Sequence, residues 1–119
     1  MGLTLPLVEV LDVGIETMTT NNHPTVLEEA ARITSVDRNE TYGHPIDNHT
    51  DCAAMWSVYL RRALGVDVRL TPRHVCWMMT LMKACRDAHS EQRDNLVDGC
   101  GWLRNAEMSD DEAARRKEG

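Results

Sequence analysis

Acidic side chains recur at helical spacing in two parts of this chain. Asp47 and Asp51 stand four residues apart, and so do Asp94 and Asp98. Because side chains four residues apart stack on one face of a helix, each pair would present two carboxylates together. Carboxylate oxygens are the ligands that Mg²⁺ prefers, and Mn²⁺ would accept the same set. The candidate metal ligands are Asp47, Asp94 and Asp98.

Two cations lie between these acidic pairs. Lys83 and Arg86 stand three residues apart on a predicted helix, and their side chains could both reach the oxygens of a phosphate group. A metal ion, two cations and several carboxylates together indicate a phosphorylated substrate. In this interpretation Asp94 and Asp98 would act in catalysis with the two cations.

Each of these residues also has an explanation that needs no ligand. Asp47 falls in the first turn of its helix, where the helix dipole favours a carboxylate by ~0.3–1 kcal/mol. Lys83 and Arg86 lie near a helix C-terminus, where the same dipole favours cations. Asp98 falls mid-helix among apolar residues and therefore needs a partner. That partner could be a metal ion or, in a salt bridge, Lys83, Arg86 or Arg104.

A polar, turn-rich segment over residues 35–45 precedes the first acidic pair. Tyr42 could stack on a nucleobase or pack the segment onto Trp56. His44 could bind a metal ion, contact a base or cap the helix that follows, and a structural hydrogen bond is the simplest of these roles. The candidate substrate-binding residues are Tyr42, His44, Asn48, Lys83, Arg86 and Asn95.

Capping residues and hydrophobic periodicity predict four helices. Thr25 and Glu28 form a capping-box pattern, Thr71 with Pro72 is typical of a helix start, and Gly65 is typical of a helix end. The predicted helices run from the Thr25 cap to about residue 34, from 46 or 47 to 64, from 72 to about 89, and from 91 to 108.

The third predicted helix carries apolar residues, several of them Met, on more than one face, and we expect it to lie at the centre of the fold. Its Met-rich surface is also the candidate interface of an oligomer. Trp77 and Trp102 are expected in the core or at an interface. Gly99 and Gly101 are costly inside a helix and imply close approach of another helix or of a ligand.

The chain divides into three parts by composition. Residues 1–22 alternate apolar residues with Pro, Gly and acids, which fits a short strand, an arm laid on a partner chain or a flexible leader. Residues 23–108 hold the predicted helices. Residues 109–119 are acidic and then basic, and we expect a frayed, solvated tail. The fold class is therefore an all-α bundle of three to four helices.

Composition limits the classes of partner and compartment. A net charge of −6 over 119 residues argues against general nucleic-acid binding. The four cysteines show no Cys-x-x-Cys pair, which favours reduced, buried thiols over disulfides or zinc and predicts a cytoplasmic protein. No apolar run approaches the ~20 residues that span a membrane. The cysteines are Cys52, Cys76, Cys85 and Cys100.

Several short motifs between residues 27 and 106 resemble a family of small phage and prophage proteins of uncharacterised function. They are Asp37-Arg38-Asn39-Glu40-Thr41-Tyr42-Gly43-His44-Pro45 with Asn48 and Trp56, Met78-Met79 with Lys83 and Arg86, and Asp94-Asn95-x-x-Asp98-x-x-Gly101-Trp102. This pattern is similar in turn to a divergent member of the MazG-like all-α nucleoside triphosphate pyrophosphohydrolases.

The MazG-like resemblance implies a Mg²⁺-dependent enzyme that cleaves (d)NTPs between the α and β phosphates. Such enzymes carry Glu-x-x-Glu on one helix and Glu-x-x-Asp on a later one. Asp98 falls on the last position of the second motif, with Asn95 in place of its Glu and Asp94 one residue earlier. The first motif has no counterpart, since Lys83 and Arg86 stand where acids would be expected.

The resemblance also implies a homodimer or tetramer, because MazG-like proteins usually build their sites between subunits. The principal hypothesis is thus a nucleotide pyrophosphohydrolase with Mg²⁺. The alternative is a non-catalytic protein that binds a nucleotide or a host factor, and the missing first motif favours it.

Overall fold

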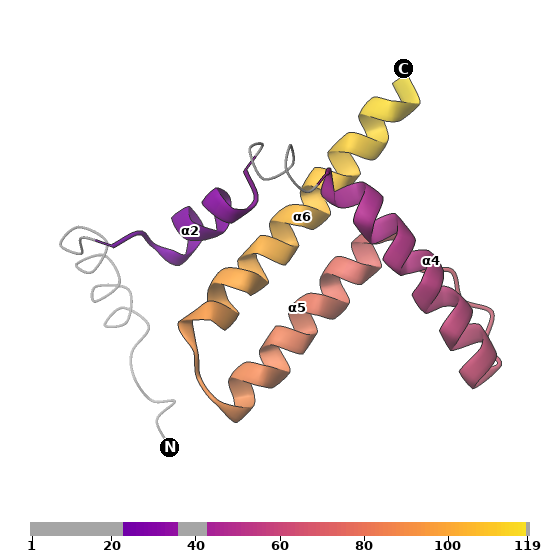
Figure 1. Ribbon diagram of the computed structural model, residues 1–119, viewed down its shortest axis with the longest axis horizontal. Coiled ribbons are helices and arrows are strands. Elements are labelled where there is room, and N and C mark those ends of the chain that lie inside the picture. The colour runs from indigo at the N-terminus through magenta and orange to yellow at the C-terminus, as the bar shows by residue number, and fades with distance from the viewer. Residues whose placement is uncertain (1–22, 36–42, 119) are drawn as a thin grey trace, which may run out of the picture.

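The computed structural model describes residues 23–35 and 43–118. Within them the chain forms four α-helices and no strand (Figure 1), which confirms the all-α class. Tyr42 and the predicted leader over residues 1–22 lie outside the described residues, so the division of the chain into leader, helical domain and tail stays a prediction.

The first two helices begin at caps that their sequences specify. Helix α2 (Val26–Ile33) follows Thr25, whose side chain and that of Glu28 bond each other's backbone N–H groups in a capping box. Helix α4 (Pro45–Leu64) follows His44 and starts one residue before the predicted range. It ends at Gly65, which adopts the left-handed conformation with φ of 66°.

Helices α5 (Pro72–His89) and α6 (Arg93–Glu118) lie side by side, joined by a short turn (Figure 1). Thr71 caps α5 as predicted. The expectation that α5 is the central helix is wrong, because α6 packs against each of the other three helices. The length of α6 explains this, since α5 runs alongside it from Asn95 to Asp110 and the end of α6 reaches the start of α4.

The predicted end of the last helix near Met108 is also wrong, because α6 continues to Glu118. Met108 and Ser109 are buried rather than at a frayed end. The charged residues that follow form ion pairs within the helix and with α4. These pairs stabilise the last turns of α6, whose sequence has few apolar residues.

The packed core is small. Most of its buried apolar side chains are short: Ala30, Ile46, Ala53, Val75, Cys76, Val97, Ala106 and Met108. The Cα radius of gyration is 17.8 Å, well above the ~13 Å of a compact 100-residue domain. The ribbon shows why, because α4 and α5 diverge from a shared end and leave an open V (Figure 1). None of the described helices is both long and apolar enough to cross a bilayer.

Candidate functional site

One ion pair between candidate residues joins α5 to α6. The Nζ atom of Lys83 lies 3.0 Å from the Oδ2 atom of Asp98. The Lys83 side chain is only 15% exposed, whereas that of Asp98 is 38% exposed. The partner that a mid-helix acid requires is therefore Lys83, one of the alternatives that the sequence left open.

This ion pair lies in a cleft of about 330 Å³ between α2, α5 and α6. The other residues of the cleft combine an aromatic ring, apolar side chains and small polar groups: Ile33, Thr34, Met79, Gly101, Trp102 and Asn105. Such a mixture of apolar walls and a few polar groups is typical of sites for small molecules. The volume falls at the low end of the usual range, about 300–1,000 Å³. We call this site the Lys83 cleft.

Helix α2 packs against Gly101 of α6 at the edge of the cleft. A Cβ atom at Gly101 would lie 3.4 Å from Cδ1 of Ile33 and 3.7 Å from Cγ2 of Thr34. The expected close approach at this position is thus that of another helix. Gly99 differs, because a Cβ atom there would meet nothing within 4 Å.

The other candidates on α5 and α6 lie outside the Lys83 cleft, although Asn95 shares a neighbouring groove of about 380 Å³ with Lys83. Arg86 is exposed and lines a different groove near the α5–α6 turn, together with His89 and Asn95. The Nδ2 atom of Asn95 donates a hydrogen bond to Oδ1 of Asp87 at 3.2 Å, which ties the start of α6 to α5. Lys83 and Arg86 therefore do not share one anion site within this chain.

The predicted acidic ligands do not gather in the described chain. Asp94 is exposed in the first turn of α6, and Asp51 is exposed on α4. Among the residues that the structure describes, no three His, Cys, Asp or Glu side chains are grouped closely enough to hold a metal ion. Asn48 is exposed on α4. The magnesium site stays a prediction, and it would need a ligand from outside this set.

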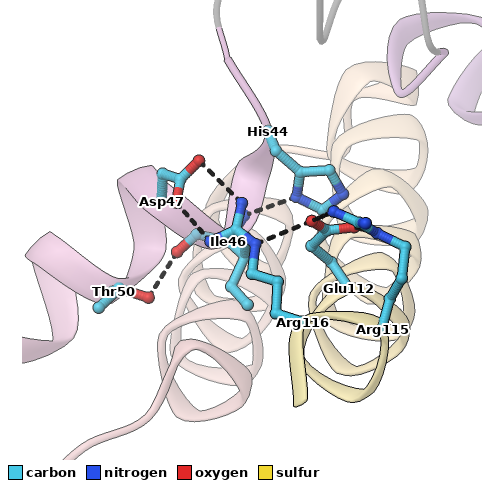
Figure 2. Close-up of polar contacts among 7 residues, drawn as sticks. All are labelled: His44, Ile46, Asp47, Thr50, Glu112, Arg115 and Arg116. Atoms are coloured by element: carbon cyan, nitrogen blue, oxygen red, sulfur yellow. Dashed lines mark hydrogen bonds and ion pairs between the residues drawn. The ribbon is translucent and has the colours of Figure 1, made fainter. Parts of the chain in front are cut away.

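The N-terminus of α4 is held by the end of α6 (Figure 2). The Nδ1 atom of His44 accepts a hydrogen bond from the backbone N–H of Ile46 at 3.1 Å, so His44 is the helix cap. Two nitrogens of Arg116 donate to the carboxylate of Asp47 at 2.9 and 3.3 Å. The hydrogen bond from Arg116 lowers the pKa of Asp47. Asp47 is therefore engaged in an ion pair between α4 and α6.

Glu112 completes this contact, which we call the α4–α6 clasp. Its carboxylate accepts hydrogen bonds from Arg115 and Arg116, and these bonds lower the pKa of Glu112 to about 2. The sequence analysis placed Arg116 in a solvated tail. The spacing of Glu112 and Arg116 could have predicted that the helix continues, because they stand four residues apart as helical ion pairs do.

The buried side chains of His49 and Cys76 form a cluster with the half-buried Trp102, which the sequence patterns did not predict. The Sγ atom of Cys76 lies 3.5 Å from Nδ1 of His49, and the rings of His49 and Trp102 are 5.2 Å apart. Burial lowers the pKa of His49 and raises the pKa of Cys76 to about 11. A neutral imidazole beside a protonated thiol does not make a nucleophile, so this cluster is part of the core. The position of His49 between Ile46 and Ala53 on one apolar face could have predicted its burial.

All four cysteines carry free thiols, as predicted. Their burial was predicted less well, because only Cys76 is buried, Cys52 and Cys100 are half-buried, and Cys85 is exposed.

Comparisons with known proteins identify a family but no activity. The family model described as "Domain of unknown function (DUF6378)" matches residues 25–108. The Gene 55 protein of Mycobacterium phage D29 is 36% identical over 78 residues, which cover 65% of this chain and 48% of that protein. The chain thus spans about half the length of the curated relative that it matches. No solved structure matches the chain.

Proposed function

This chain belongs to the DUF6378 family of unknown function, and from that premise we propose that it is a phage-type protein that binds a nucleotide in the Lys83 cleft. The observation that carries the proposal is the Lys83–Asp98 ion pair inside a mixed polar and apolar cleft. The likeness to a phage gene product supports a phage or prophage origin. The MazG-like resemblance of the sequence supports a nucleotide as the ligand.

The chemistry of the cleft fits the parts of a nucleotide. The indole ring of Trp102 offers a surface for a planar base. The amide of Asn105 and the carboxylate of Asp98 can bond polar groups on a base or a sugar. The ammonium group of Lys83 can exchange its bond with Asp98 for one to a phosphate oxygen. The volume of about 330 Å³ suits a nucleoside or monophosphate better than a whole triphosphate.

Binding without hydrolysis is favoured over catalysis for the single chain. Asp98 is paired with Lys83 and Asp47 with Arg116, so two of the three predicted metal ligands already have cationic partners. The described residues do not group three candidate ligands. A Mg²⁺-dependent step therefore has no support from the geometry of the described residues.

Mg²⁺-dependent pyrophosphohydrolysis of (d)NTPs is the second candidate. One observation favours it: Asp94 and Asp98 stand one turn apart on α6, and Asp98 already lies in the cleft. This candidate requires a further carboxylate from a second copy of the chain, in keeping with the homodimer or tetramer that the resemblance implies.

Calorimetric titration of the full chain with nucleoside monophosphates and triphosphates, with and without Mg²⁺, tests the first proposal. Binding is expected without metal, and Lys83→Met should weaken it. Arg73→Met is the matched control, since it removes a cation from the same helix outside the cleft. Equal affinity in wild type and Lys83→Met would contradict the assignment of the site.

A coupled phosphate assay with added pyrophosphatase, Mg²⁺ or Mn²⁺ and a panel of (d)NTPs separates the two candidates. Turnover that is lost in Asp98→Ala would establish the hydrolase and overturn the preference for binding alone. An absence of both turnover and binding with every nucleotide would contradict both candidates. It would leave interaction with a host factor as the remaining hypothesis.

A further inference from the structure

Helix α5 presents an apolar stripe that no described part of the chain covers. Trp77, Met78 and Leu81 are 46%, 40% and 61% exposed. Cys85 and Ala88 follow at spacings that continue the same side of the helix. None of these five positions carries a charge. The sequence left Trp77 as a core or an interface residue, and its exposure excludes the core of the described chain.

Helix α4 presents a second apolar stripe. Met55 and Tyr59 stand four residues apart and are 65% and 71% exposed. Beside them, Trp56 and Leu60 are half-buried. The two stripes meet at a groove of about 280 Å³ that Trp56, Tyr59 and Leu60 form with Met78 of α5. The two stripes are therefore continuous across α4 and α5.

The exposed apolar area is large for a monomer of this size. Five large side chains that are 40–71% exposed leave roughly 100 Å² each, or on the order of 500 Å², open to solvent. Their smaller neighbours add to this. A monomer seldom exposes a larger contiguous apolar patch, about 300–600 Å², and a stable interface takes about 800 Å² per partner.

We propose that a second copy of this chain covers the two stripes, with α4 and α5 of one copy packed against α4 and α5 of the other. A two-fold arrangement brings the same residues to both sides, so an uncharged apolar surface meets its own equivalent. The product is a core of four helices, two from each copy. A ligand that covered only one stripe would leave the other exposed, whereas the paired stripes of a second copy cover both. We call this surface the α4–α5 interface.

This proposal does not depend on the proposed function. The α4–α5 interface contains none of the residues that line the Lys83 cleft. It also extends the prediction that the Met-rich third helix is an oligomer interface, because it adds the stripe on α4 and fixes the mode of docking.

Size-exclusion chromatography with light scattering on the full chain measures the assembly directly. The expected mass is twice the chain mass of 13.5 kDa. Leu81→Glu and Tyr59→Glu place a charge at exposed positions, so the helices should form while the dissociation constant rises by roughly a hundredfold or more. Leu27→Glu is the matched control, because Leu27 is 71% exposed on α2, outside the interface, and should leave the dimer intact.

The thiol of Cys85 provides a second readout. It is exposed in the single chain, so its labelling by a thiol reagent should slow as protein concentration rises and the interface closes. The concentration dependence should disappear in Leu81→Glu and persist in Leu27→Glu.

Three outcomes would overturn the proposal. A monomer that binds no hydrophobic dye would mean that another segment of the same chain covers the stripes. A monomer that binds a hydrophobic dye would mean that the surface serves a different protein. A dimer that survives both Leu81→Glu and Tyr59→Glu would place the contact elsewhere.

Discussion

Replacing Asp98 with Ala is expected to destabilise the fold more than replacing Lys83 with Met, although both changes break one ion pair. After Asp98→Ala, the Lys83 ammonium group loses its partner on a side chain that is only 15% exposed. A buried polar group that loses its partner costs about 1–3 kcal/mol. After Lys83→Met, the 38% exposed Asp98 carboxylate can be hydrated, and the cost should stay below about 1 kcal/mol.

Urea unfolding of wild type, both single variants and the double variant measures this asymmetry at one fixed protein concentration. Each kcal/mol corresponds to roughly 4–8 °C in Tm for a domain of this size. The double variant should be about as stable as Lys83→Met alone, since it no longer contains an unpaired charge. Equal losses of unfolding free energy in the two single variants, or additive losses in the double variant, would show that Asp98→Ala does not leave Lys83 as a buried, unpaired charge.

Four further predictions concern buried or bridging polar groups. Ser57→Ala should cost about 1–3 kcal/mol in urea unfolding, because Ser57 accepts a hydrogen bond from the Leu70 N–H at 2.8 Å. Ser109→Ala should be neutral or stabilising, since the buried Ser109 hydroxyl has no hydrogen-bond partner among the described residues; a loss as large as that of Ser57→Ala would contradict this. Burial lowers the pKa of His49 in the folded state, so the unfolded state binds its proton first and stability should fall as pH drops below ~6.5. His49→Phe should flatten this dependence of the free energy of unfolding on pH. An unchanged dependence would exclude His49 as its source. Arg116→Gln should raise the pKa of Asp47 toward its ordinary value in an NMR titration, and an unchanged pKa would contradict the clasp.

Local chemistry explains why most of the helices could be predicted. The caps at Thr25, Thr71 and Gly65 act within a few residues, and the structure places each where the sequence indicated. The end of α6 depends instead on contacts with distant segments. Arg116 bonds Asp47, 69 residues away along the chain, and no periodicity in the last ten residues reveals that partner.

The candidate site was predictable only in part, for the same reason. Helical spacing placed Lys83 and Asp98 on neighbouring helices, and their pairing was one of the stated alternatives. Spacing did not show that Arg86 faces a different groove, because that depends on how α5 rotates against α6. It also did not show that Gly101 accommodates α2 while Gly99 faces open space.

The central claim is that the Lys83 cleft binds a nucleotide, and an NMR titration of the full chain with nucleoside monophosphates in the absence of metal tests it most directly. The chemical shifts of the Gly101 amide and the Trp102 indole N–H should change together and saturate. Lys83→Met should remove both changes. Saturating shifts confined to the Arg86 groove, or no shifts with any nucleotide, would contradict it.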